Sequence, residues 1–200
     1  MQKRTLESYS EIAKLACDSP QPAMQKWTEF AELLEYLDGR EFKNILEIGT
    51  LNGGTLKGWR EIARKDARFT MLDYGDIPVT DILKLPKEGQ FAQCTIGDSH
   101  NPDTAQLIKE YAPFDFIFID GDHTYEGVKK DFEMYAPMLV EGGIVGFHDI
   151  VEHTKHKKVG VFKFWAELKK AYPKCEIKEF IDLEYLTDHG IWGGIGTIKL

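Results

Sequence analysis

Short apolar runs alternate with segments of helical spacing along most of this chain. The runs end abruptly at glycine or polar residues, as expected of strands buried on both faces of a sheet. We therefore predict five strands, each followed by a helix, at 45–48, 69–73, 91–96, 114–119 and 144–147. The alternation predicts a doubly wound α/β fold with a mostly parallel sheet.

Further elements are predicted at both ends of the chain. Segments 6–16 and 27–37 have helical spacing and precede the first strand, so we assign residues 1–40 to an N-terminal helical cap and 41–200 to the main domain. These helices could cover the sheet, the pocket or a partner chain. Segments 176–181 and 191–200 are predicted to be two closing strands, with Asp188, His189 and Gly190 in a hairpin turn. The expected sheet thus has seven strands.

A glycine-rich turn follows the first strand. Gly49, Gly53 and Gly54 permit a sharp turn, and the segment from Thr55 has helical spacing, so helix N–H groups should face a ligand. The spacing differs from the G-x-G-x-x-G of dinucleotide enzymes. Glu47, inside the strand, would repel a pyrophosphate and suit a ligand with a cationic amine.

This turn resembles the first motif of class I S-adenosylmethionine (SAM) methyltransferases. Asp73 lies about 20 residues beyond it, the distance at which a second-strand acid meets ribose hydroxyls, although a solvated strand-end aspartate is the alternative. Gly97, Asp98 and Ser99 resemble the motif in which the acid meets the adenine amino group; helix capping is the alternative, but Asn101 already supplies a cap. The cofactor residues implied are Glu47, Gly49, Thr50, Asn52, Gly53, Asp73, Gly97, Asp98, Ser99 and Asp120.

Acids and histidines follow the fourth and fifth strands. Asp120, Asp122, His123, His148 and Asp149 should meet at the carboxyl edge of the sheet, facing the ligand of the glycine turn. Carboxylates beside a histidine can bind a divalent cation, which would lower the pKa of a substrate hydroxyl. A histidine can act as the base with or without a metal.

Two longer stretches make the resemblance more specific. IDGDHTYEGV (119–128) and PMLVEGGIVGFHDI (137–150) are similar to the group of cephalosporin-hydroxylase-like proteins and macrolide-sugar O-methyltransferases. This resemblance implies a magnesium or manganese site at Asp120, His148 and Asp149, with Asp120 and His123 as catalytic residues and His123 as the base.

The sequence leaves several alternatives open at this site. His148 stands where an acid is common in metal-dependent relatives, and imidazole suits zinc, manganese or iron better than magnesium. His148 and Asp149 could instead pair with each other, and His123 could simply order its loop. Asp122 could orient His123 or cap the next helix. The polar run 151–160 is either a lid or, by default, a solvated loop.

Composition limits the classes of partner. The net charge of −8 argues against nucleic acid or an anionic membrane as the main partner. The three cysteines are far apart and indicate neither a disulfide framework nor a zinc site. Without a long apolar stretch or a signal-peptide pattern, a cytoplasmic location is expected.

The sequence therefore predicts a SAM-dependent methyltransferase, acting on a hydroxyl of a small molecule such as a sugar or natural product. The amphipathic N-terminal helices are compatible with a homodimer. A non-catalytic SAM- or nucleoside-binding module is one alternative. A nicotinamide-dependent oxidoreductase is another, which Glu47 and the glycine spacing disfavour.

Overall fold

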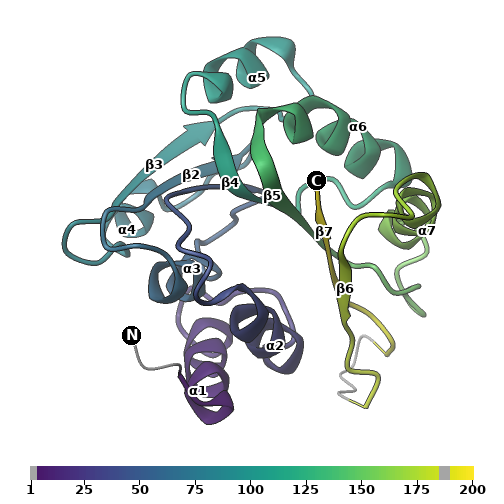
Figure 1. Ribbon diagram of the computed structural model, residues 1–200, viewed down its shortest axis with the longest axis horizontal. Coiled ribbons are helices and arrows are strands. Elements are labelled where there is room, and N and C mark those ends of the chain that lie inside the picture. The colour runs from purple at the N-terminus through teal and green to yellow at the C-terminus, as the bar shows by residue number, and fades with distance from the viewer. Residues whose placement is uncertain (1–3, 185–189) are drawn as a thin grey trace.

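The computed structural model describes residues 4–184 and 190–200 and has a seven-stranded sheet at its centre (Figure 1). The strand order is β3-β2-β1-β4-β5-β7-β6, with β1 to β5 parallel and β7 antiparallel to both neighbours. The predicted doubly wound, mostly parallel sheet is therefore confirmed. The strands are β1 (Asn44–Ile48), β2 (Arg68–Asp73), β3 (Phe91–Ile96), β4 (Phe114–Ile119), β5 (Leu139–His148), β6 (Ile177–Phe180) and β7 (Ile195–Lys199).

Helices cover both faces of this sheet (Figure 1). One layer contains α1, α2 and α3, and the other contains α5, α6 and α7. The helices are α1 (Leu6–Cys17), α2 (Trp27–Leu37), α3 (Leu56–Ile62), α4 (Val79–Ile82), α5 (Pro102–Lys109), α6 (Tyr125–Tyr135), followed by the 3₁₀ turn η1 (Ala136–Met138), and α7 (Val161–Ala171).

Strand β4 shows how one strand serves two cores. Successive side chains point to opposite faces of a strand, so Phe116 and Phe118 enter one apolar cluster while Ile117 and Ile119 enter the other. All four are at most 2% exposed, which accounts for the unbroken apolar run in the sequence.

The two N-terminal helices pack into the first of these clusters. Tyr9 of α1 and Phe30 of α2 are fully buried there, and the Phe30 ring lies edge-on to Trp59 of α3. These helices therefore share a core with the sheet. The proposed division at residue 40 remains a prediction about sequence organisation.

Some predicted boundaries were wrong. Strand β7 begins at Ile195 instead of 191, because Gly193 and Gly194 both have φ +80°, outside the extended region. Strand β5 begins at Leu139, five residues before the predicted start. The turn predicted at Asp188 and His189 lies outside the described residues.

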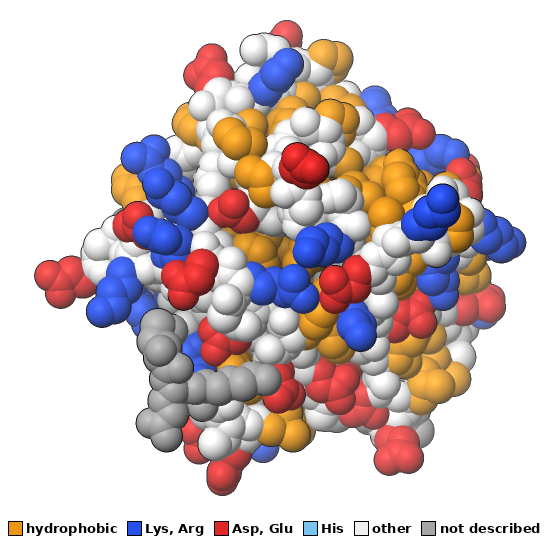
Figure 2. Space-filling view, in the orientation of Figure 1, with side chains coloured by type: hydrophobic (Ala, Val, Ile, Leu, Met, Phe, Trp, Pro, Cys, Tyr) orange, Lys and Arg blue, Asp and Glu red, His pale blue; other side chains and the backbone are white. Residues whose placement is uncertain are grey.

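The visible surface carries charges of both signs. On the face that Figure 2 shows, acidic and basic side chains are interspersed, and those drawn in colour form no continuous basic surface. No helix among the described residues is long and apolar enough to cross a membrane.

Candidate active site

A cavity of about 850 Å³ opens at the carboxyl edge of the parallel strands. The turns after β1, β2 and β3 line one end, which we call the cofactor end (Glu47–Leu51, Gly54, Thr55, Asp73, Tyr74 and Gly97–His100). The residues after β4 and β5 line the other end, together with the segment just before α2 and the segment just before β7. This acceptor end contains Met24, Gln25, Asp120, His123, His148, Asp149, His153, His156 and Trp192.

Gly49 lies where the two ends meet. Its φ is +85°, and a Cβ there would come within 2.1 Å of the backbone oxygen of Asp120. Only glycine fits this conformation and this close approach, which explains why the β1 run stops at that residue.

Glu47 lies beneath the glycine turn and is 1% exposed. Its carboxylate accepts hydrogen bonds from the hydroxyl of Thr55 and, at 3.3 Å, from that of Thr50. Burial raises the pKa of Glu47 to about 8, and the nearby negative charge of Asp120 adds to this rise. A ligand with a cationic amine at this position would favour the ionised carboxylate.

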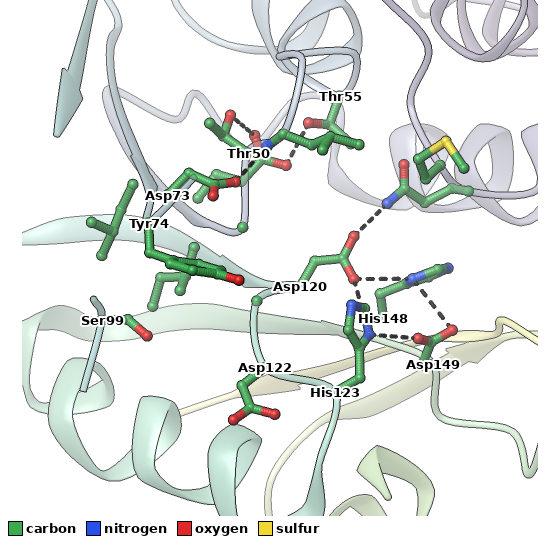
Figure 3. A pocket seen from close by; sticks show the side chains of 18 of the residues that line it. Thr50, Thr55, Asp73, Tyr74, Ser99, Asp120, Asp122, His123, His148 and Asp149 are labelled. Atoms are coloured by element: carbon green, nitrogen blue, oxygen red, sulfur yellow. Dashed lines mark hydrogen bonds and ion pairs between the residues drawn. The ribbon is translucent and has the colours of Figure 1, made fainter. Parts of the chain in front are cut away.

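Asp73, at the end of β2, lines the cavity and fixes the glycine turn (Figure 3). One carboxylate oxygen accepts a hydrogen bond from the backbone N–H of Leu51 at 2.7 Å, and the other from that of Gly75 at 2.9 Å. The alternative of a merely solvated aspartate is therefore wrong, because this side chain joins two turns of the cofactor end.

The loop after β3 completes the cofactor end. Asp98 accepts a hydrogen bond from the backbone N–H of His100 at 2.8 Å. Asn101 supplies the cap of α5 by accepting from Asp103 N–H at 2.9 Å, as predicted. Of the predicted cofactor residues, Asn52 and Gly53 do not line the cavity, whereas the others do. Gly53 is needed for the turn itself, with φ +73° and the side chain of Ile82 against it.

At the acceptor end, Asp149 holds two histidines. Its Oδ2 lies 2.7 Å from Nδ1 of His123, and its Oδ1 lies 2.9 Å from Nε2 of His153. Asp149 has φ +64°, a left-handed conformation that aspartate tolerates better than most residues. In this conformation the carboxylate faces the rings of His123 and His153. Figure 3 shows its contact with His123.

His148 lies between the two strand-end acids and is 4% exposed. Its Nδ1 is 3.1 Å from Oδ1 of Asp120 and 3.4 Å from Oδ1 of Asp149 (Figure 3). Burial opposes a charge on this ring, but the carboxylates of Asp149 and Asp120 outweigh it and raise the pKa of His148 to about 10. The pairing of His148 with Asp149, one of the sequence alternatives, is therefore present.

The charges of this cluster stabilise one another. The hydrogen bond to Asp149 is the main cause of the raised pKa of His123, and burial opposes it. Burial alone would raise the pKa of Asp149, but His148, His123 and His153 hold it well below its usual range. Asp149 is consequently an anion that orients both histidines.

Three side chains come close enough together to share a metal ion. Single ligand atoms of Asp120, His123 and Asp149 lie within 4.8 Å of one another. Two carboxylates and an imidazole fit a divalent transition metal or magnesium. This set contains His123 where the sequence led us to expect His148, whose Nδ1 also points at both acids.

Asp122 does not orient His123. It points away from Asp120 and His123 in Figure 3, and its Oδ1 accepts a hydrogen bond from the backbone N–H of Thr124 at 2.8 Å. Thr124 itself caps α6 by accepting from Gly127 N–H at 3.0 Å. Asp149, and not Asp122, is the carboxylate that orients the ring of His123.

Sequence reasoning missed several residues of the acceptor end. The run 151–160 is not simply a solvated loop, because His153 is 5% exposed and contacts Asp149. Gln25 donates a hydrogen bond from Nε2 to Oδ2 of Asp120 at 2.7 Å, from 95 residues away. Met24 and Trp192 also line this end. Only the tertiary structure brings these segments together; no local pattern marks them.

Comparison with known proteins identifies the fold. Over 98% of the chain, the structure superposes on 90% of an O-methyltransferase from Bacillus cereus in complex with SAH, with a TM-score of 0.66 and 22% identity. It also superposes on MycE, a methyltransferase of the mycinamycin biosynthetic pathway in complex with Mg, SAH and mycinamycin VI. That match has a TM-score of 0.67 and 16% identity and covers 99% of this chain and 55% of MycE.

The sequence comparisons give the family. Protein y4gI of Sinorhizobium fredii is 33% identical over 88 residues, which are 42% of this chain and 9% of y4gI, so the chain corresponds to a small part of that relative. The model of a family described as a methyltransferase domain matches residues 46–150, which are more than half of the chain and include residues of both ends of the cavity. The chain therefore belongs to this family of methyltransferase domains.

Proposed function

We propose that this protein is a SAM-dependent O-methyltransferase that acts on a hydroxyl group of a small molecule such as a sugar or natural product. One observation carries the proposal. The Asp149–His123 pair, with 2.7 Å between the carboxylate and ring nitrogen, lies in the same cavity as the glycine turn and Asp73. The proposed base and the proposed site for the methyl donor would thus share one cavity.

The cofactor end supplies groups for each part of SAM. In this proposal Glu47 meets the cationic amine of the methionine portion and Asp73 meets the ribose hydroxyls; both residues line the cavity. Asp98 and Ser99 lie on the loop after β3, where the adenine would be bound. When bound, SAM supplies an electrophilic methyl group on a sulfonium.

His123 is proposed as the base of the acceptor end. With the Nδ1 hydrogen donated to Asp149, the other ring nitrogen, Nε2, is the acceptor of neutral imidazole. It would take the proton of the substrate hydroxyl as the oxygen–methyl bond forms and the sulfur–methyl bond breaks. The products are the methyl ether, S-adenosylhomocysteine (SAH) and a protonated His123.

A divalent cation fits the same end of the cavity. We propose that Asp120 and Asp149 hold it with His148, the set predicted from the sequence, so that His123 remains the base. The ion would hold substrate oxygens and favour the deprotonated hydroxyl. It would have to replace the proton that His148 carries, so its affinity should rise with pH.

The partners follow from the same proposal. A small-molecule acceptor is expected, a nucleic acid or membrane partner is not, and we propose a cytoplasmic enzyme that forms a homodimer. The charge of −8 supports the proposal on nucleic acid and anionic membranes. The apolar faces of α1 and α2 pack into the core of this chain, so their amphipathic pattern gives no separate support for the homodimer.

The test is transfer of a labelled methyl group from SAM to a panel of sugars and phenolic natural products, with magnesium or manganese present. SAH should form only when an acceptor is added, and chelation should slow its formation. If the His123→Ala variant forms SAH at the wild-type rate, the proposed base is wrong. If no acceptor is methylated although SAM binds, a non-catalytic role is the better account.

A further inference from the structure

Helix α6 packs against the loop after β3, which belongs to the cofactor end of the cavity. Gly127, Asp131 and Tyr135 follow one another at intervals of four residues, so they lie on one face of this helix. Tyr135 donates a hydrogen bond from its hydroxyl to the backbone oxygen of Ser99 at 2.9 Å. The next residue of the loop, His100, contacts the other two. One helix face therefore holds two consecutive residues of the loop.

These contacts define the orientation of the His100 ring. Its Nε2 lies 3.2 Å from the backbone oxygen of Gly127 and 3.3 Å from Oδ1 of Asp131. A carbonyl and a carboxylate accept hydrogen bonds only, so Nε2 must carry a hydrogen. His100 also lines the cavity, with 20% of its side chain exposed. Helix α6 thus fixes one side of a ring that forms part of the cavity wall.

Asp131 is a costly residue to bury at this position. It is fully buried, and neither carboxylate oxygen makes a hydrogen bond within the usual geometric limits to any described residue. Burial raises the pKa of Asp131 to about 6, and the charges of Asp122 and Asp98 add to this rise. The carboxyl nevertheless remains mostly ionised at pH 7. A buried carboxylate with weak contacts destabilises a fold, so packing alone does not account for it.

We infer that Asp131 is a positioning residue for the cofactor and acts through His100. It holds the ring as the part of the cavity wall against which the adenine of SAM or SAH packs. Asp131 does not line the cavity itself, so its effect on the ligand must pass through the loop. The inference rests on the proposed function, because it assumes that the adenine is bound at the loop after β3.

The test measures the affinity of the purified protein for SAH and for adenosine by titration calorimetry, together with Tm. Asp131→Asn keeps the size of the side chain and an acceptor atom but removes the charge. Both affinities should fall about tenfold, because both ligands carry the adenine. Tm should stay the same or rise, since a buried charge with weak contacts is removed.

A double-mutant cycle shows whether the effect passes through His100. His100→Ala removes the ring and should itself weaken the binding of both ligands. Adding Asp131→Asn should then cause no further loss, because the ring that Asp131 holds is gone. Asp131→Leu gives the same comparison if the asparagine variant does not fold. Glu133→Gln is the matched control, because it removes an exposed acid of the same helix and should bind both ligands like wild type.

Three results would overturn the inference. The first is wild-type affinity for SAH and adenosine in Asp131→Asn. The second is a fall of Tm together with both affinities, which would assign Asp131 to the fold alone. The third is additive losses for Asp131→Asn and His100→Ala, which would show that Asp131 does not act through the ring. Failure of the proposed function looks different, because the wild-type protein would then bind neither SAH nor adenosine.

Discussion

The two ends of the cavity are built in different ways. The cofactor end comes from one stretch of the chain, residues 47–100, and Asp73 bonds to Leu51 within it, 22 residues away. The acceptor end comes from segments far apart, with Gln25 bonded to Asp120 and Glu29 to Gly194, 165 residues away. A local motif can specify the first, whereas only the complete fold assembles the second.

Because the two ends are built from different segments, variants of the acceptor end should lower the rate of catalysis while leaving the affinity for the cofactor intact. Variants of the cofactor end should chiefly weaken the binding of the cofactor. Gly49, where the two ends meet, should affect both.

Replacing His123 by alanine removes the proposed base. We expect kcat to fall by about 10²- to 10⁴-fold, the usual contribution of a positioned base, with SAH affinity unchanged. In wild type, the rate should rise with pH as His123 loses its proton, and the contact with Asp149, which raises the pKa of His123, moves this rise to higher pH than for an ordinary histidine. Steady-state rates across pH check both points. A variant that keeps its rate, or loses SAH affinity equally, contradicts the separation of the two ends.

Gly49→Ala tests the meeting point. Its Cβ would come within 2.1 Å of the Asp120 backbone oxygen, so we expect destabilisation of about 3 kcal/mol and loss of SAH binding. Urea unfolding and calorimetry are the measurements. Gly39→Ala is the matched control, because Gly39 has a similar φ of +84° but nothing within 4 Å of the added Cβ. Equal losses in the two variants would mean that backbone strain alone, without the contact to Asp120, explains the effect.

Asp73→Ala tests the cofactor end by itself. Losing the proposed contacts with the ribose, and those that hold Leu51 and Gly75, should weaken SAH binding by about 10- to 100-fold. The far-ultraviolet circular dichroism spectrum should stay unchanged, since Asp73 lies at the edge of the core. Unchanged SAH affinity by calorimetry would refute the ribose role.

The smallest expected effect concerns Glu47, whose carboxyl should release a proton when SAH binds. Its pKa is about 8 in the free protein, so at pH 7 the carboxyl is mostly protonated, and the amine of the ligand would favour ionisation. SAH binding at pH 7 should therefore release up to about one proton, seen as a dependence of the binding heat on buffer ionisation enthalpy. Proton release should vanish in Glu47→Gln. Release that persists there would assign it to another group.

The same residue also has a defined effect on stability. A carboxyl whose pKa is raised by folding stabilises the protein below its unfolded pKa, and this stabilisation is lost as pH rises towards 8. Glu47→Gln should accordingly reduce the fall of Tm between pH 5 and pH 8.

Much of the fold could be predicted from the sequence. Runs such as 114–119 are apolar on both faces, and their period and length specify buried strands. The start of β7 could not be predicted, because apolar residues at 191 and 192 extend the pattern while the left-handed Gly193 and Gly194 end the strand. The alternation of apolar and polar residues along a strand carries no information on the backbone φ of a glycine, so it could not show where β7 begins.

The candidate site was predictable to different extents at its two ends. Strand ends mark Asp73, Asp120 and Asp149, since parallel strands deliver them to one edge. Gln25 and His153 carry no such signal, because their roles depend on contacts with Asp120 and Asp149 across the fold. Asn52 was assigned by its place in the motif, yet neither it nor Gly53 lines the cavity.

Titration calorimetry of the purified protein with SAH and, separately, with NAD, each with and without manganese, tests directly whether this cavity holds the methyl donor. SAH should bind with micromolar affinity, NAD should not bind, and a second heat should appear when manganese is added. Binding of NAD without binding of SAH would contradict the proposed function and point to the nicotinamide alternative.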